Sequence, residues 1–122
     1  MEKQYPEIIL IKNADNVGFA LGNNGAMETA LERGCDFVFL LNNDTTLDRD
    51  CLSELVRLAM SDPRVGMVGP KIHLFNDPSI VWYAGGEIVF REAISVNRGF
   101  FKKDRPAYNT GGEDTFVSAC AI

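Results

Sequence analysis

The stretch that decides the predicted fold is FVFLLNNDT, residues 37–45. Its first five residues form a continuous apolar run, which is typical of a strand buried on both faces in a parallel sheet. Asn42, Asn43 and Asp44 then follow at the carboxyl end of that strand, where open α/β sheets bind their ligands. A carboxylate there suits Mg²⁺, which takes one or two carboxylates and completes its octahedron with phosphate oxygens and water. Asn-Asn-Asp also favours an Asx-type turn leading into a helix, and this structural alternative stays open.

The elements on either side of this stretch alternate between strand and helix. Residues 8–11 are a second continuous apolar run and predict a buried strand. Residues 13–25 are crowded with Asn and Gly and predict a loop, with a helix running from Asn24 to a stop at Gly34. Asp48 is a candidate cap for a second helix, whose predicted inward face is Leu52, Leu55, Val56, Ala59 and Met60. This order predicts right-handed crossovers and a parallel sheet covered by helices, which is an α/β fold.

The second half of the chain has a different character. After a short predicted strand at residues 65–68, prolines and aspartates break up the pattern. Gly85-Gly86 then predicts a hairpin between residues 80–84 and 87–90. Residues 97–112 mix Gly, Pro and charged residues, and they predict a loop region. This half therefore favours antiparallel pairing.

The chain ends on apolar residues, 116–122, which predict a core strand. Domain termini are usually polar and exposed, so we expect the chain to be a fragment of something longer. We expect a single domain with a parallel α/β part, about residues 1–70, and an antiparallel part, about residues 71–122.

Composition and charge exclude several classes of protein. The 122 residues are 46% hydrophobic and 24% charged, which is an ordinary globular composition and not that of a disordered or collagen-like chain. The net charge of −5 gives no basic footprint for a nucleic acid. Cys35, Cys51 and Cys120 form no Cys-x-x-Cys pair and predict reduced, buried thiols. No apolar run is long enough to span a bilayer and no secretion signal opens the chain, so we expect a cytoplasmic protein.

The stretch NVGFALGNNG, residues 16–25, has two interpretations. It is either a long connection that ends at a helix N-terminus or a loop that binds a nucleotide. The second interpretation is supported because amide groups at a helix N-terminus favour anions, and Asn side chains both donate and accept hydrogen bonds.

Taken together, residues 16–24 and 32–45 resemble the family 2 glycosyltransferases, in particular their rhamnosyltransferase-like branch. In that family the first loop reads Asn-x-Gly-Phe-x-x-Gly-x-Asn-x-Gly and lies near the donor nucleotide. The second loop carries an Asp-x-Asp-type metal motif, often in the form Asn-x-Asp found here. The resemblance implies a truncated GT-A fold with a Rossmann-like mixed sheet, a nucleotide-sugar donor such as dTDP-rhamnose or a UDP-sugar, and Mg²⁺ or Mn²⁺. It also implies transfer with inversion to a glycan or lipid-linked acceptor in polysaccharide biosynthesis.

The resemblance assigns roles to individual residues. Donor-binding positions are Asn16, Gly18, Asn23, Asn24, Asn42 and Asn43. Asp44 is the expected metal ligand. Two positions depart from the family pattern, since Ala26 and Ala119 stand where the family has glycine.

The resemblance also predicts parts that the chain does not contain. The family's first strand is expected before Tyr5, and the acidic segment with the catalytic base after Ile122, so no catalytic residue is assigned within the chain. Glu113-Asp114 is interpreted as loop charge. An inverting transfer needs a carboxylate within hydrogen-bond reach of the acceptor hydroxyl. We therefore expect the isolated chain to bind a nucleotide-sugar weakly if at all and not to turn it over.

Other residues favour structural interpretations. His73 has no His, Cys or carboxylate at ligand spacing and predicts a solvent-side strand residue. Trp82 and Tyr83 point to opposite faces of a strand and predict at least one core side chain. Phe100-Phe101 with Lys102-Lys103 leaves open a contact with a lipid-linked acceptor, and so a peripheral location at the inner face of the membrane.

Two alternative functions stay open at this point. One is a non-catalytic nucleotide-sugar-binding or structural remnant. The other is a sugar-phosphate nucleotidyltransferase, which also pairs a glycine-rich loop with a metal-binding Asp. The uncovered edges of a truncated sheet further predict pairing with a second copy, which would give a homo-oligomer.

Overall fold

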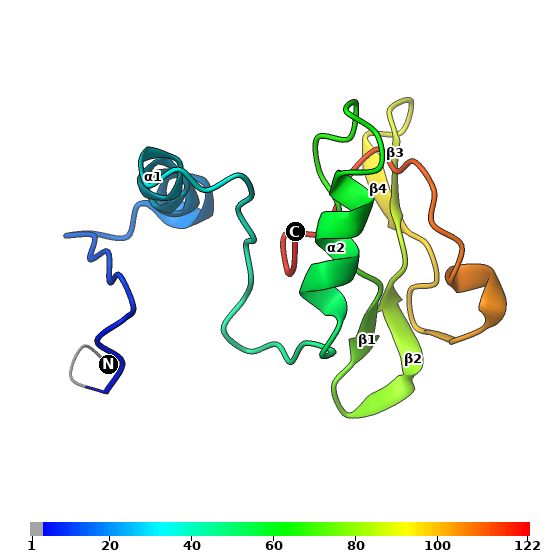
Figure 1. The fold of residues 1–122 in the computed structure, drawn as a ribbon. Coiled ribbons are helices and arrows are strands. Elements are labelled where there is room, and N and C mark those ends of the chain that lie inside the picture. The colour runs from blue at the N-terminus through cyan, green and yellow to red at the C-terminus, as the bar shows by residue number, and fades with distance from the viewer. Residues whose placement is uncertain (1–3) are drawn as a thin grey trace. The chain divides into compact units, whose positions relative to one another are not determined.

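The computed structural model describes residues 4–122 and divides the chain into two compact units, Met1–Val38 and Phe39–Ile122. The described part of the first unit contains helix α1 (Gly18–Glu32). The second contains helix α2 (Cys51–Ala59), a set of short strands and the 3-10 helix η1 (Pro106–Tyr108) (Figure 1).

Helix α1 begins at Gly18 because Asn16 turns the chain into it. The Oδ1 atom of Asn16 accepts a hydrogen bond from the Gly18 N–H at 3.0 Å, as in an Asx-type turn. The predicted start at Asn24 is therefore wrong, since residues 18–24 already belong to the helix. The predicted stop at Gly34 is confirmed. Its φ is +78°, and its N–H donates to the Leu31 carbonyl at 2.9 Å.

The predicted buried strand at residues 8–11 is wrong. These residues form no strand, and they are 41–52% exposed. A continuous apolar run is buried only where partner strands flank it and helices cover both faces. Among its described residues the first unit offers a single helix and no partner strand, so nothing there buries the run.

Helix α2 begins at Cys51, later than a cap at Asp48 would place it. Asp48 instead shapes the turn before the helix. Its Oδ1 atom accepts the Asp50 N–H at 3.0 Å, and its carbonyl accepts the Cys51 N–H at 3.1 Å. The predicted inward face is only partly right, because Leu55 is buried whereas Leu52, Val56 and Met60 are exposed.

The decisive stretch, residues 37–45, is not a parallel strand. Leu41 forms an isolated antiparallel bridge with Ala121. The Leu40 N–H donates to the Ile122 carbonyl at 2.7 Å, and the Ile122 N–H donates back to the Leu40 carbonyl at 3.0 Å. The strands predicted at residues 37–41 and 116–122 are thus replaced by a short antiparallel contact between these two segments. The sequence predicts each of these two segments as a strand of a larger sheet.

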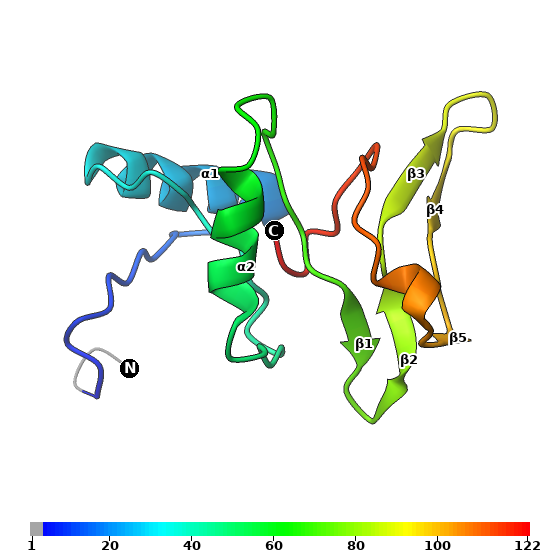
Figure 2. The same cartoon turned by 45° about the vertical axis from the view of Figure 1, so that its right-hand side comes forward.

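The strands of the second unit form two antiparallel sheets. β1 (Ile72–Leu74), β2 (Asp77–Tyr83) and β5 (Lys102–Lys103) are arranged in the order β1-β2-β5, while β3 (Gly86–Val89) pairs with β4 (Ile94–Asn97) (Figure 2). The predicted loop at residues 97–112 therefore contains a strand and a helical turn. The predicted strand at residues 65–68 is absent.

The predicted hairpin between residues 80–84 and 87–90 is also wrong. β2 pairs with β1 and β5, and β3 pairs with β4, so at Gly85 the chain passes from one sheet to the other instead of turning back. Gly85 has a φ of +116°, and a Cβ at this position would lie 2.6 Å from Asp114 Oδ1. Only glycine combines this backbone angle with so close an approach.

The core of the second unit is small and is centred on β2. Val81, Tyr83 and Ala84 are at most 4% exposed, and Tyr108 of η1 joins the apolar cluster of Val81 and Ala84. Trp82 is half-buried, so the prediction that at least one of the adjacent aromatics is a core residue is confirmed by Tyr83. The Tyr83 hydroxyl donates to the Phe116 carbonyl at 2.9 Å, which ties the last segment to β2.

All strand pairs among residues 4–122 are antiparallel. The GT-A fold, which needs a parallel ladder in its nucleotide-binding half, stays a prediction. None of the helices in this part of the chain is both long enough and apolar enough to cross a bilayer.

Candidate metal and donor site

The turn at residues 42–45 presents Asp44 at the surface. The turn is fixed to the last segment of the chain, because the Asn42 N–H donates to the Cys120 carbonyl at 3.0 Å. It is closed by the Thr45 hydroxyl, which donates to the Asn42 carbonyl at 2.7 Å. Asn42, Asn43 and Asp44 are all exposed. The three predicted side chains of this turn therefore lie together and face solvent.

The Asp44 carboxylate is accessible to a cation. Within residues 4–122 no hydrogen bond or ion pair engages it. Burial and, to a smaller degree, the charge of Asp44 raise the pKa of the Cys120 thiol. The described residues assemble no group of three His, Cys, Asp or Glu side chains around a metal position. A divalent cation at Asp44 stays a prediction.

An open cleft of about 540 Å³ lies next to this turn, within the second unit. Residues 45–48 and Cys51 line part of it, and residues 70–75 and Cys120 line another part. Small-molecule sites have volumes of roughly 300–1,000 Å³. The structure thus provides space for a small ligand beside the Asp44 turn.

The donor residues predicted upstream all lie at the start of α1. Gly18, Asn23 and Asn24 occupy its first two turns, and Asn16 precedes it. The Asn23 Nδ2 atom donates to the Phe19 carbonyl at 2.8 Å, so this side chain lies back along the helix. These residues belong to the first unit, and Asn42, Asn43 and Asp44 belong to the second. A site shared by the two groups stays a prediction.

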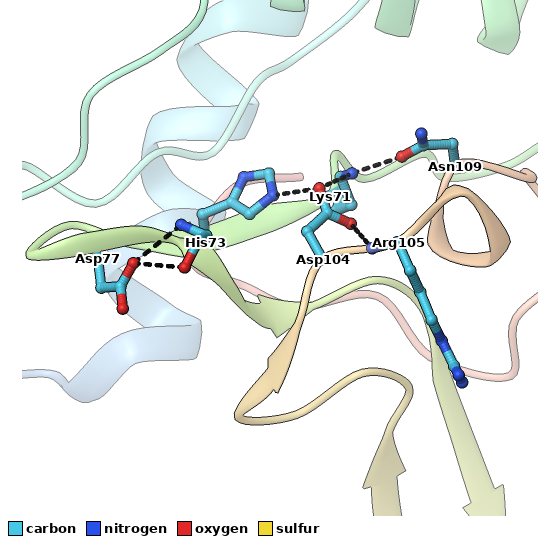
Figure 3. A network of polar contacts seen from close by, with 7 residues as sticks. Lys71, His73, Asp77, Asp104, Arg105 and Asn109 are labelled. Atoms are coloured by element: carbon cyan, nitrogen blue, oxygen red, sulfur yellow. Dashed lines mark hydrogen bonds and ion pairs between the residues drawn. The ribbon is translucent and has the colours of Figure 1, made fainter.

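A polar network in the second unit was not anticipated from the sequence (Figure 3). Lys71 Nζ donates to Asp104 Oδ2 at 2.6 Å and also to Asn109 Oδ1, and the His73 Nε2 atom lies 2.9 Å from Asp104 Oδ2. The hydrogen bonds from Lys71 and then His73 lower the pKa of Asp104 to about 2. His73 is therefore not a simple solvent-side residue, because it is half-buried against a carboxylate.

The sequence indicates only one side of this network. Lys71 and His73 are two residues apart, which places them on one face of an extended segment. Their partners Asp104 and Asn109 lie more than thirty residues away and come next to β1 through the β1-β2-β5 sheet. No local pattern encodes that pairing.

The remaining sequence predictions concern two acidic residues and the three cysteines. Glu113-Asp114 does lie in an irregular segment, as expected for loop charge. The three cysteines are free, but Cys35 is exposed, and Cys51 and Cys120 are only half-buried. The prediction of buried thiols is therefore wrong.

Comparison with known proteins gives one partial similarity. No family model matches the chain, and no solved structure matches it. Over 58 residues the chain is 36% identical to Hyaluronan synthase 3 of Gallus gallus. The matched segment is 48% of this chain and 9% of that protein, so the chain spans less than a tenth of its relative. The similarity is to a family 2 glycosyltransferase and agrees, at that coarse level, with the resemblance carried by residues 16–24 and 32–45.

Proposed function

We propose that the chain is the donor- and metal-binding part of a family 2 glycosyltransferase. The proposed reaction moves a sugar from a nucleotide-sugar, dTDP-rhamnose or a UDP-sugar, to a glycan or lipid-linked acceptor with inversion. The observation that carries the proposal is Asp44, an unpaired carboxylate on an exposed turn beside a cleft, within a motif typical of that family. The partial similarity to Hyaluronan synthase 3 supports the proposal at the level of a glycosyltransferase.

The residues of the turn suit the departure of a nucleoside diphosphate. When the glycosidic bond breaks, negative charge grows on the diphosphate, and a divalent cation held there would stabilise that charge. Asp44 would hold the cation, Mg²⁺ or Mn²⁺. Asn42 and Asn43 offer amide donors and acceptors to the ribose or the diphosphate. Asn16, Gly18, Asn23 and Asn24 are proposed as further donor-side contacts.

Calorimetric titration of UDP and of dTDP into the chain, with and without Mn²⁺, tests this assignment. We expect weak binding that requires the cation. The Asp44→Asn variant should lose at least about tenfold in affinity, because even residues behind a metal's ligands are worth 10–100-fold. The Asp36→Asn variant is the matched control, since it removes one exposed carboxylate from the segment that precedes the turn.

Two results would contradict the proposal. One is nucleotide binding that is independent of the cation and unchanged in Asp44→Asn. The other is an equal loss in Asp36→Asn, which would mean that overall charge, rather than the turn, controls binding.

A further inference from the structure

Residues 98–105, RGFFKKDR, carry a charge opposite to that of the whole chain. They contain four cations and one acid, whereas the chain has a net charge of −5. The acid, Asp104, is directed inward onto Lys71 and His73, while Arg105 extends away from that network (Figure 3). Lys102, Lys103 and Arg105 are exposed. The outward face of this segment is therefore cationic.

Two phenylalanine rings are exposed beside these cations. Phe100 is 48% exposed and Phe101 is 60% exposed. Their ring centroids lie 4.7 Å apart in an edge-to-face arrangement. Water thus contacts a paired aromatic surface that a folded chain ordinarily buries.

The backbone holds this aromatic pair in a fixed turn. The Lys102 N–H donates to the Gly99 carbonyl at 2.9 Å, and the Phe101 N–H donates to the Val81 carbonyl at 2.9 Å. Phe101 has a φ of +53°, an angle that a bulky residue rarely adopts and that Gly or Asn accepts more readily. Gly99 lies against Val81 and Tyr108 of the core. The rings are therefore presented by a turn anchored to the most buried strand.

Not every charge of the segment faces outward. The Arg98 guanidinium donates to the carbonyl oxygens of Ala84 and Thr110. Hydrogen bonds from Ser79 and, more weakly, the charge of Lys103 lower the pKa of Asp77, so Lys103 has an acidic neighbour. The Arg105 guanidinium carbon lies 4.8 Å from the centre of the Tyr108 ring, so this cation also contacts η1 while its side chain remains exposed. Lys102 and the exposed part of Arg105 supply the rest of the outward charge.

We propose that residues 98–105 form a docking surface for an anionic lipid bilayer. Exposed aromatic rings enter the boundary between headgroups and acyl chains, and flanking Lys and Arg side chains pair with lipid phosphates. A soluble polyanion would use the cations but leave both rings in water, so the combination favours a bilayer. The inference is independent of the function proposed above, and Asp44→Asn should leave it unchanged.

Co-sedimentation of the chain with vesicles of phosphatidylcholine, with and without phosphatidylglycerol, tests the inference. We expect binding to the anionic vesicles that weakens as salt rises. Lys102→Gln should reduce partitioning about fivefold. Adding Lys103→Gln should reduce it further but by less than about fivefold, because Asp77 partly offsets the charge of Lys103. Phe101→Asn should reduce it about tenfold without straining the backbone, since Asn tolerates a positive φ.

Matched controls come from the opposite end of the β3–β4 ribbon and from the loop before α2. Phe90→Asn removes an aromatic side chain that is 80% exposed at the β3–β4 turn. Arg49→Gln with Arg91→Gln removes two exposed cations. These variants should bind vesicles as the parent chain does, and thermal unfolding should confirm that every variant is folded.

Any of four outcomes would overturn the inference. Equal losses in the control variants would show that binding is unspecific. Equal binding to neutral and anionic vesicles would show that the surface does not recognise anionic lipid. No binding to anionic vesicles would show that the surface does not dock on a bilayer. Binding to soluble heparin that matches vesicle binding and is indifferent to Phe101→Asn would identify a polyanion site instead.

Discussion

At the scale of single residues, Asp104 is the best-defined electrostatic centre of the described chain. One carboxylate oxygen contacts both Lys71 and His73, and the other accepts the Arg105 N–H at 2.8 Å. It therefore connects β1 to the segment that precedes η1. Asp44, by contrast, is exposed and forms no ion pair within residues 4–122.

The pairing of Asp104 predicts an acid-sensitive contribution to stability. Its pKa is lowered from 3.8 to about 2 in the folded chain. A lowered folded pKa stabilises the fold above the unfolded value, and this stabilisation is lost as pH falls through the folded value. The difference in melting temperature between the parent chain and Asp104→Asn should thus be largest above about pH 5 and should shrink towards about pH 2. Glu87→Gln, a change at an exposed residue, should show no such trend, and a pH-independent Asp104→Asn difference would contradict the assignment.

At the scale of elements, glycines decide where the strands of the second unit meet other segments. Gly86 pairs with Asn97 in the β3–β4 ladder, and it also bridges Phe116. A Cβ on Gly86 would overlap the Phe116 ring. The pairing of β3 with the last segment therefore depends on the absence of a side chain at Gly86.

The Gly86→Ala variant should be destabilised by about 1–3 kcal/mol, the range observed when extra atoms are forced into a packed site. Gly111→Ala is the matched control, because a Cβ there meets open space at an ordinary backbone angle. Chemical denaturation of both variants gives the comparison. A Gly86→Ala variant as stable as Gly111→Ala would mean that Phe116 moves aside at little cost.

The elements also show how much of the fold the sequence predicts. The stop of α1 at Gly34 and the existence of α2 follow from local patterns and are found. The apolar runs at residues 8–11 and 37–41 predict strands, but whether such a run forms a buried strand depends on partner strands elsewhere in the chain. Gly85-Gly86 predicts a hairpin, but β2 and β3 belong to different sheets, and Asp114 and Arg98 lie where a side chain on Gly85 would be. Contacts of this kind are made by residues far apart in the sequence, so no local sequence pattern predicts them.

At the scale of the whole molecule, the predicted site divides between two units. Asn16, Gly18, Asn23 and Asn24 lie in the first, and Asn42, Asn43 and Asp44 lie in the second. The proposed function requires both groups to contact one nucleoside diphosphate. The proposal therefore predicts that one bound nucleotide affects residues of both groups, which can be measured in solution.

Paramagnetic Mn²⁺ with UDP provides that measurement. We expect the cation to broaden the backbone amide resonances of residues 42–45 and also those of residues 16–24. Asp44→Asn should abolish both effects, whereas Asp36→Asn should retain them. Broadening confined to residues 42–45 would contradict a shared site while leaving a cation at Asp44.

The chain contains one tryptophan, Trp82, and it lies on β2 between two core residues, Val81 and Tyr83. Indole emission therefore reports the unfolding of the sheet around that strand. Far-ultraviolet circular dichroism senses both helices. Comparing it with indole emission during thermal unfolding shows whether the two units unfold together or one after the other.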